Sequence, residues 1–188
     1  YESTDGGTHW VQKDNGLTDT HVDALWLNQT NPQVLVATTF SDGVFYSTNG
    51  GANWTNVYSS SATAIVQAGS TLYVATGNGI VESIDNGATW QLVEATSSPV
   101  RALGWSQGAL YAGLDNGTII GRPAPGQPWK TLLPSAANTT AWGIAVNPTN
   151  PQEAIVVLMG PHGLENEVTQ DGGTTWSTWT APPNGGFG

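Results

Sequence analysis

The chain has 188 residues, enough to bury one sizeable core, and only 10 % of them are charged, with four Lys and Arg against fourteen Asp and Glu. The formal charge of −10 argues against nucleic acid or an anionic membrane surface as a partner, because both are bound through clustered Lys and Arg. No apolar run is long enough for membrane insertion, and the absence of cysteine excludes disulfides and thiolate chemistry.

Short apolar runs separated by turn residues follow one another along the chain, and no stretch has helical periodicity. Residues 1–14 predict one turn and one short strand, Trp10–Lys13. Residues 17–58 predict four strands, at Val22–Leu27, Gln33–Thr39, Gly43–Thr48 and Trp54–Tyr58. Residues 61–96 predict four more, at Ala64–Gln67, Thr71–Thr76, Gly79–Ile84 and Trp90–Glu94.

The second half of the chain repeats this organisation. Residues 99–134 predict strands at Val100–Trp105, Ala109–Gly113, Gly117–Gly121 and Trp129–Leu133. Residues 139–182 predict strands at Ala141–Val146, Glu153–Met159, Glu165–Gln170 and Trp176–Thr180, and residues 183–188 are expected to be a tail or linker. The second strand of each group is apolar throughout, as expected for a strand that packs on both faces.

One eight-residue motif, Ser/Thr-x-Asp/Asn-x-Gly-x-x-Trp, which we call the box, joins the third and fourth strands of each group. Complete copies occupy residues 3–10, 47–54, 83–90 and 169–176. A decayed copy keeps Gly126 and Trp129 but has Arg122 and Ala124 in place of the hydroxyl and the carboxylate. The tryptophans recur every 36 to 47 residues, a period typical of four-stranded propeller blades.

The residue types of the box are those of a tight turn. Glycines accept positive φ, Ser, Thr, Asp and Asn side chains hydrogen-bond backbone groups inside the turn, and the tryptophan buries a large ring at the start of the next strand. A structural role is therefore predicted for Ser3, Asp5, Gly7, Trp10, Ser47, Asn49, Gly51, Trp54, Ser83, Asp85, Gly87, Trp90, Gly126, Trp129, Thr169, Asp171, Gly173 and Trp176.

The motif resembles the Asp-box (BNR) repeat of sialidases, sortilin-type receptors, xyloglucanases and photosystem II assembly factors. The resemblance implies an all-β fold, a β-propeller or part of one, with four-stranded antiparallel blades. It also implies that the boxes lie away from the functional face. Residues 1–14 then correspond to the outer hairpin of an incomplete blade, so we expect another copy or further blades to close the propeller.

Loops at the opposite ends of the blades form the candidate binding face. The fourth-to-first and second-to-third connections lie there, and Gly160–Glu165 is expected to be the longest loop. The candidate residues on this face are His21, Asp23, Asp42, Asn78, Arg101, Asp115, Trp142, His162 and Glu165.

Enzymatic activity has little support in the residues. A sialidase-like site needs three arginines, and this chain has two. Hydrolysis by a pair of acids would have to use Asp23, Asp42, Asp115 or Glu165, which are expected to be solvated loop residues. The arginine patch of the assembly factors is also missing.

No cofactor or metal site is predicted, because His9, His21 and His162 lack ligand spacing. Four Asn-x-Thr sequons, beginning at Asn28, Asn53, Asn116 and Asn138, are expected by chance in a chain this rich in Asn and Thr. We therefore expect a non-catalytic extracellular or cell-surface module that binds a protein or carbohydrate partner or serves a structural role. The alternative is a fragment of a secreted glycoside hydrolase, xyloglucanase-like or sialidase-like, whose catalytic residues need further blades.

Overall fold

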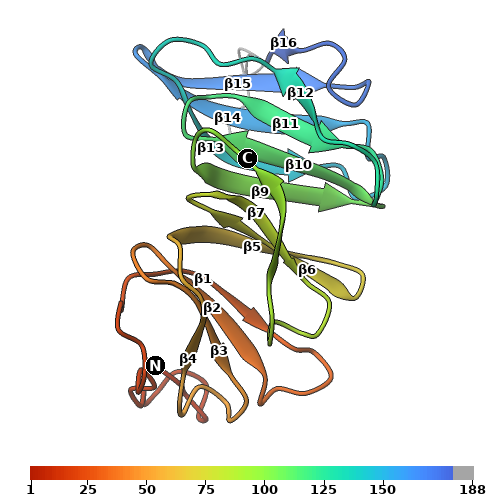
Figure 1. Ribbon diagram of the computed structural model, residues 1–188. Coiled ribbons are helices and arrows are strands. Elements are labelled where there is room, and N and C mark those ends of the chain that lie inside the picture. The colour runs from red at the N-terminus through yellow and green to blue at the C-terminus, as the bar shows by residue number, and fades with distance from the viewer. Residues whose placement is uncertain (180–188) are drawn as a thin grey trace. The chain divides into compact units, whose positions relative to one another are not determined.

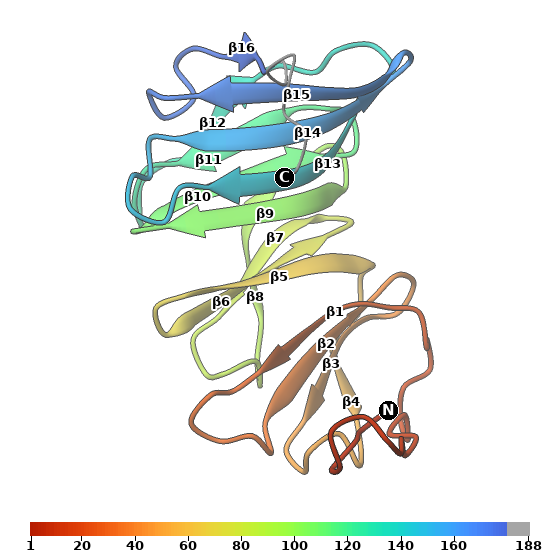
Figure 2. The same ribbon diagram turned by 180° about the vertical axis from the view of Figure 1, so that it is seen from behind.

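The computed structural model describes residues 1–179, which form sixteen β-strands and no helix (Figure 1, Figure 2). The predicted all-β class is confirmed. The described residues accordingly include no helix that could cross a membrane. Contacts divide the chain into two compact units, Tyr1–Ser97 and a second beginning at Ser98, which are described separately below.

The first unit contains two antiparallel four-stranded sheets in which each strand pairs with the next along the chain. The first sheet comprises β1 (Val22–Leu27), β2 (Leu35–Thr39), β3 (Gly43–Ser47) and β4 (Thr55–Tyr58). The second comprises β5 (Ala62–Ala68), β6 (Thr71–Thr76), β7 (Gly79–Ser83) and β8 (Gln91–Ala95). One core cluster packs the two sheets together and contains Val36, Val44, Ala62, Leu72, Val74 and Val81.

The second unit has the same construction. Its first sheet comprises β9 (Val100–Ser106), β10 (Ala109–Leu114), β11 (Ile119–Arg122) and β12 (Lys130–Leu133). Its second sheet comprises β13 (Thr140–Val146), β14 (Ala154–Gly160), β15 (Gly163–Thr169) and β16 (Ser177–Thr178). Ile119 of the first sheet packs with Ala141, Val156 and Leu158 of the second, so the sheets share a core. We call the four sheets the first to the fourth blade, in chain order.

Two expectations about local structure were wrong. The segment Gly160–Glu165 is a tight hairpin rather than the longest loop, because Gly160 pairs with Gly163 and only Pro161 and His162 lie between the strands. Gly163 takes a φ of 113°, which a residue with a side chain rarely adopts. The predicted strand Trp10–Lys13 is reduced to one bridge, between Glu2 and Val11, because no other strand lies beside it. The predicted end of the fourth blade, residues 180–182, and the predicted tail, residues 183–188, lie outside the described residues.

Every complete box folds into the same hydrogen-bonded turn. In the second copy, Ser47 Oγ accepts the N–H of Gly51 at 3.0 Å and donates to Asn49 Oδ1 at 3.1 Å. The N–H of Asn53 also donates to Asn49 Oδ1, at 2.9 Å. The equivalent bond from glycine N–H to hydroxyl measures 2.8, 2.8 and 2.9 Å in the first, third and last copies. The turn therefore closes through its own side chains.

The decayed box closes by other means. Arg122 is buried and places its guanidinium 5.3 Å from the centre of the Trp129 ring, a cation–π contact. The N–H of Gln127 donates to the carbonyl of Ala124 at 3.2 Å, and Gly126 takes a φ of 76°. A backbone turn and a stacked side chain thus replace the hydroxyl and the carboxylate.

Hydrogen bonds in the boxes lower the pKa of the box carboxyl groups. The backbone N–H and the ring of His9 lower the pKa of Asp5 from 3.8 to about 2. At Asp85, burial raises the pKa, but the hydroxyl and N–H of Thr89 and the Ser83 hydroxyl outweigh it, so the pKa is lowered. When folding lowers the pKa of a carboxyl group, the unfolded chain takes up the proton at a higher pH than the folded chain does. Stability is therefore lost as the pH falls from the pKa of the unfolded chain to that of the folded chain.

We therefore expect the first unit to lose stability as the pH falls from about 4 towards 2. The variant Asp85→Asn should fold at pH 7, because Asn49 already fills this position in the second box, and it should show a shallower acid transition. Urea denaturation across this pH range measures both effects. An acid transition of unchanged steepness in Asp85→Asn would show that this carboxylate does not contribute.

The box tryptophans should differ in their effect on stability according to burial. Trp54 is only 8 % exposed and packs with Ala37 and Phe45, so Trp54→Ala should lower the free energy of unfolding by about 3–5 kcal/mol. Trp142 is 64 % exposed and is the control. Trp142→Ala should change the free energy of unfolding by less than about 0.5 kcal/mol. Urea denaturation followed by circular dichroism compares them. Equal losses would show that ring burial is not the cause.

Candidate functional site

The first strand of every blade contains a β-bulge near its start. In β1, Val22 pairs with Thr39 and Ala24 with Thr38, so the register skips Asp23. The same break in the ladder occurs in the other three blades, where the register skips Thr63, Arg101 and Trp142. Bulges re-aim side chains and are frequent beside functional sites. Three of the four bulge positions belong to the predicted binding face.

In the first unit, Asp19 organises this end of the first blade. Its carboxylate accepts the N–H of His21 at 2.8 Å and that of Ser41 at 2.7 Å, which ties the start of β1 to the β2–β3 turn. These two bonds lower the pKa of Asp19. The ring of His21 stacks on Phe40, with centroids 5.4 Å apart, and its Nε2 lies 3.6 Å from Asp23 Oδ1.

Other predicted residues of the first unit have local roles. Asp42 accepts a hydrogen bond from the Thr18 hydroxyl, and its carbonyl accepts one from the Asn56 side chain at 2.7 Å. Asn78 is exposed in the β6–β7 turn, where its carbonyl accepts the N–H of Thr96 at 3.3 Å. Asp19 and Phe40 were missed by sequence reasoning. The spacing Asp19-x-His21, which allows an Asp side chain to bond a backbone two residues on, was the available signal for Asp19.

In the second unit, Arg101 and Asp115 form an ion pair. Arg101 Nε donates to Asp115 Oδ1 at 2.9 Å, and both side chains are about one-third exposed. The carbonyl of Asp115 accepts the hydroxyl of Thr140 at 2.9 Å, so the β10–β11 loop is tied to the start of β13. Trp142 is the bulge residue of β13 and is mostly exposed. Arg101 and Trp142 thus hold equivalent bulge positions in the two blades of this unit, one as part of a fixed pair of charges and the other as an exposed ring.

The two remaining predicted residues lie at the β14–β15 hairpin. His162 is exposed at its tip, and Glu165 is exposed within β15, opposite Leu158. The Glu165 carboxylate packs against Gly160, where an added Cβ would come within 3.2 Å of it. The structure therefore brings together His21 with Asp23 and Arg101 with Asp115, and it gives the other predicted residues separate surroundings.

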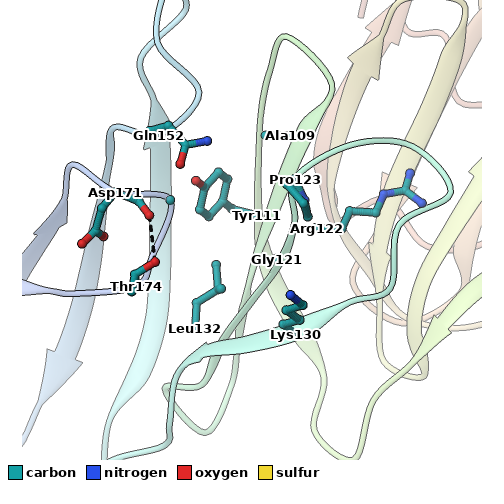
Figure 3. Close-up of a pocket in the computed structure, with 11 residues that line it drawn as sticks. Ala109, Tyr111, Gly121, Arg122, Pro123, Lys130, Leu132, Gln152, Asp171 and Thr174 are labelled. Carbon is teal, nitrogen blue, oxygen red and sulfur yellow. Dashed lines mark hydrogen bonds between the residues drawn. The ribbon is translucent and has the colours of Figure 1, made fainter.

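A cavity of about 210 Å³, not predicted from the sequence, lies between the two blades of the second unit near their box turns (Figure 3). Tyr111 points into it and donates its hydroxyl to the carbonyl of Pro151 at 2.8 Å. Burial, and secondarily the charge of Asp171, raise the pKa of Tyr111. The lining also includes Lys130, Gln152 and Thr174.

The acid in this cavity is committed to its own box turn. The hydroxyl and the N–H of Thr175 donate to Asp171, and these bonds lower its pKa. A general acid needs a raised pKa, so Asp171 suits a structural role. Elsewhere, burial raises the pKa of Glu94 on β8. Among residues 1–179, no three His, Asp or Glu side chains are placed to hold a metal ion.

Solved structures share this fold, although no protein-family model and no curated protein matches the sequence. A GH74 xyloglucanase from Xanthomonas campestris matches 84 % of this chain with a TM-score of 0.67 and 17 % identity, over 29 % of its own length. The extracellular domain of a putative hybrid two-component system from B. thetaiotaomicron matches 90 % with a TM-score of 0.67 and 15 % identity, over 23 % of its length. YCF48 from Cyanidioschyzon merolae matches 87 % with a TM-score of 0.61 and 12 % identity, over 57 % of its length.

The chain is built of β-propeller blades. It spans less than a third of the length of the xyloglucanase, and at these identities the likeness concerns the fold alone. The predicted architecture of four-stranded antiparallel blades is confirmed.

The Arg101–Asp115 ion pair should contribute little to stability, because partly exposed pairs are screened by solvent. A double-mutant cycle with Arg101→Ala and Asp115→Ala should give a coupling energy of about 0.2–1 kcal/mol in urea denaturation. A coupling above about 2 kcal/mol would mean that the pair holds the fold together instead of shaping a surface.

Proposed function

We propose that this chain is a non-catalytic, extracellular propeller module of the Asp-box type that binds a protein or glycan partner. The Asp-box assignment is supported by the box turns, whose side-chain hydrogen bonds recur in four copies. The extracellular assignment is supported by the low charged fraction and by the likeness to an extracellular sensor domain.

The observation that carries the binding proposal is the exposed ring of Trp142 at a strand bulge. Trp142 is 64 % exposed and is the residue that the register skips in the first strand of the fourth blade. The equivalent bulge position of the other blade in this unit holds Arg101, whose bond to Asp115 fixes a donor and an acceptor. Tryptophan and arginine dominate the energetics of binding surfaces, and an aromatic face also stacks on sugar rings.

A glycoside hydrolase fragment remains the second candidate, favoured by the likeness to the GH74 xyloglucanase. Hydrolysis requires one acid to be poised as a proton donor opposite a second carboxylate. Three of the predicted acids already have other partners: Asp115 is engaged by Arg101, Glu165 packs on Gly160, and Asp42 accepts the Thr18 hydroxyl. Asp23 Oδ1 lies 3.6 Å from His21 Nε2. We therefore propose binding rather than catalysis.

Binding can be tested with immobilised chain and a panel of xyloglucan, β-glucan and sialylated oligosaccharides, together with extracellular proteins. Trp142→Ala should weaken binding of the best ligand by about 2 kcal/mol or more, as for a central aromatic contact. Trp105→Ala is the matched control. Trp105 is also an exposed tryptophan of a first strand, but it lies at the end of β9 opposite the bulge at Arg101.

The same oligosaccharides test catalysis. We expect no sugar release from the wild-type chain. Release that is lost in Asp115→Ala or Glu165→Ala would favour the hydrolase. Ligand binding unchanged in Trp142→Ala would show that the binding site lies elsewhere.

A further inference from the structure

The first blade has an apolar face that the described residues leave largely uncovered. Val22 of β1 is 39 % exposed, whereas Ala62 and Ala141, which hold the same register position in β5 and β13, are 0 % exposed. Leu25, further along β1, is 59 % exposed. A cleft of about 460 Å³ lies over this face, with Leu27 and Leu35 also in its lining. In the second and fourth blades, the equivalent face is covered by the preceding blade.

The contacts inside each unit show what covers such a face. In the second unit, Gly104 of β9 lies so close to β13 that an added Cβ would come within 2.7 Å of Ile144 and 2.9 Å of Val146. In the first unit, Trp26 Nε1 of β1 donates to Gln67 Oε1 of β5 at 3.0 Å. Gly104 and Trp26 hold the same register position in their strands. Within each unit, the second blade is therefore covered by the blade before it in the chain. The covering surface is the face of that blade on which Gly104 of β9 or Trp26 of β1 lies.

Within the described residues of the second unit, the fourth blade leaves that covering surface open. Ala145, Ile155 and Val168 form one cross-strand row on β13, β14 and β15, and they line an open cleft of about 410 Å³ together with Trp179. Ala145 holds the register position of Gly104 and Trp26. The row corresponds to Trp26, Val36 and Tyr46 of the first blade, which pack against the second blade. Leu25 and Leu27 of β1 hold the register positions of Ile144 and Val146 in β13. If the fourth blade covered the first blade as β9 covers β13, Ala145 would contact Leu25 and Leu27, as Gly104 contacts Ile144 and Val146.

We propose that the uncovered face of the first blade binds the fourth blade of a second copy of this chain. Both complementary surfaces occur on one polypeptide, and both repeat a contact that already exists inside each unit. Two such contacts, each joining the first blade of one copy to the fourth blade of the other, would close a ring with two-fold symmetry. Two copies of the 188-residue chain would supply eight blades to this ring, a number within the range of known propellers.

Residues 1–14 take the place of an outer strand beside this face. Trp54 Nε1 donates to the carbonyl of Lys13 at 3.0 Å, just as Trp176 Nε1 donates to the carbonyl of Leu132 on β12 at 3.2 Å. Lys13 and Leu132 each follow a box tryptophan by three residues. Among residues 1–179, β16 holds the corresponding place in the fourth blade through two ladder pairs and a further bond, from the N–H of Trp179 to the carbonyl of Asn166 at 2.7 Å. Residues 1–14 would therefore lie along the outer side of the partner's fourth blade, next to its β16.

Disulfide trapping tests the contact directly, because the chain has no cysteine of its own. The variants Leu25→Cys and Ala145→Cys, mixed and oxidised, should form a cross-linked species of twice the 19.6 kDa chain mass that contains one copy of each. Neither variant alone should cross-link to the same extent. Non-reducing electrophoresis with mass spectrometry of the linked peptide identifies the product.

Sedimentation equilibrium on the 188-residue chain measures the association itself. Leu25→Lys should raise the dissociation constant at least about 100-fold, because the contact would bury an unpaired ammonium. Ile84→Lys is the matched control, since Ile84 is 79 % exposed in a box turn and lines neither cleft. Ala145→Lys gives the same test from the opposite surface if Leu25→Lys does not fold.

A monomer at all concentrations, with no mixed disulfide, would overturn the proposal. So would a disulfide formed within one molecule of the double variant Leu25→Cys/Ala145→Cys, because the two faces would then close on each other without a second copy. An association that Leu25→Lys and Ala145→Lys leave unchanged would place the interface elsewhere and reject it equally.

Discussion

Each complete box depends on one hydroxyl oxygen that accepts the N–H of a glycine four residues later. Ser47, Ser83 and Thr169 are buried, so their glycine N–H groups would be costly to leave without a partner. Once the hydroxyl has closed the turn, the tryptophan three residues after that glycine is directed into the blade. Its ring then packs, or its Nε1 reaches the outer strand of the preceding blade, as Trp176 does. In the last copy, the local hydrogen bond thus leads to a contact between blades, whereas Trp10 and Trp90 donate Nε1 to the carbonyl of a glycine in their own box.

The third blade shows what happens when that hydroxyl is missing. Arg122 occupies the position and stacks on Trp129, and the hairpin between β11 and β12 still forms. Arg122 and Pro123 are among the residues that line the neighbouring cavity, and the Arg122 guanidinium is directed away from Tyr111 (Figure 3). The hairpin therefore forms without the box hydrogen bonds, because the Arg122–Trp129 contact and the backbone turn at Ala124 replace them.

The strands and box turns could be predicted from sequence because they depend on neighbouring residues: alternating apolar runs, glycines and short hydroxyl or carboxyl side chains. Features that depend on distant partners could not. Trp10 and Trp54 stand at the same place in identical motifs, yet Trp10 is exposed and Trp54 is buried, because only Trp54 has a strand-like segment beside it. The cavity near Tyr111 depends on two blades together and has no sequence signature. On the candidate face, Arg101 and Asp115 were predicted to share a surface, but their contact and the bulges follow from strand register, which sequence alone does not reveal.

The bulges have a consequence for how such a protein can change over time. A residue that the register skips contributes no side chain to the cross-strand rows that pack the blades, so its replacement leaves those rows intact. In this chain the four equivalent positions hold an acid, a hydroxyl, a base and an indole: Asp23, Thr63, Arg101 and Trp142. Under the proposed binding role, mutations at these places would change ligand specificity while the cross-strand packing stays constant, so recognition and stability could evolve separately.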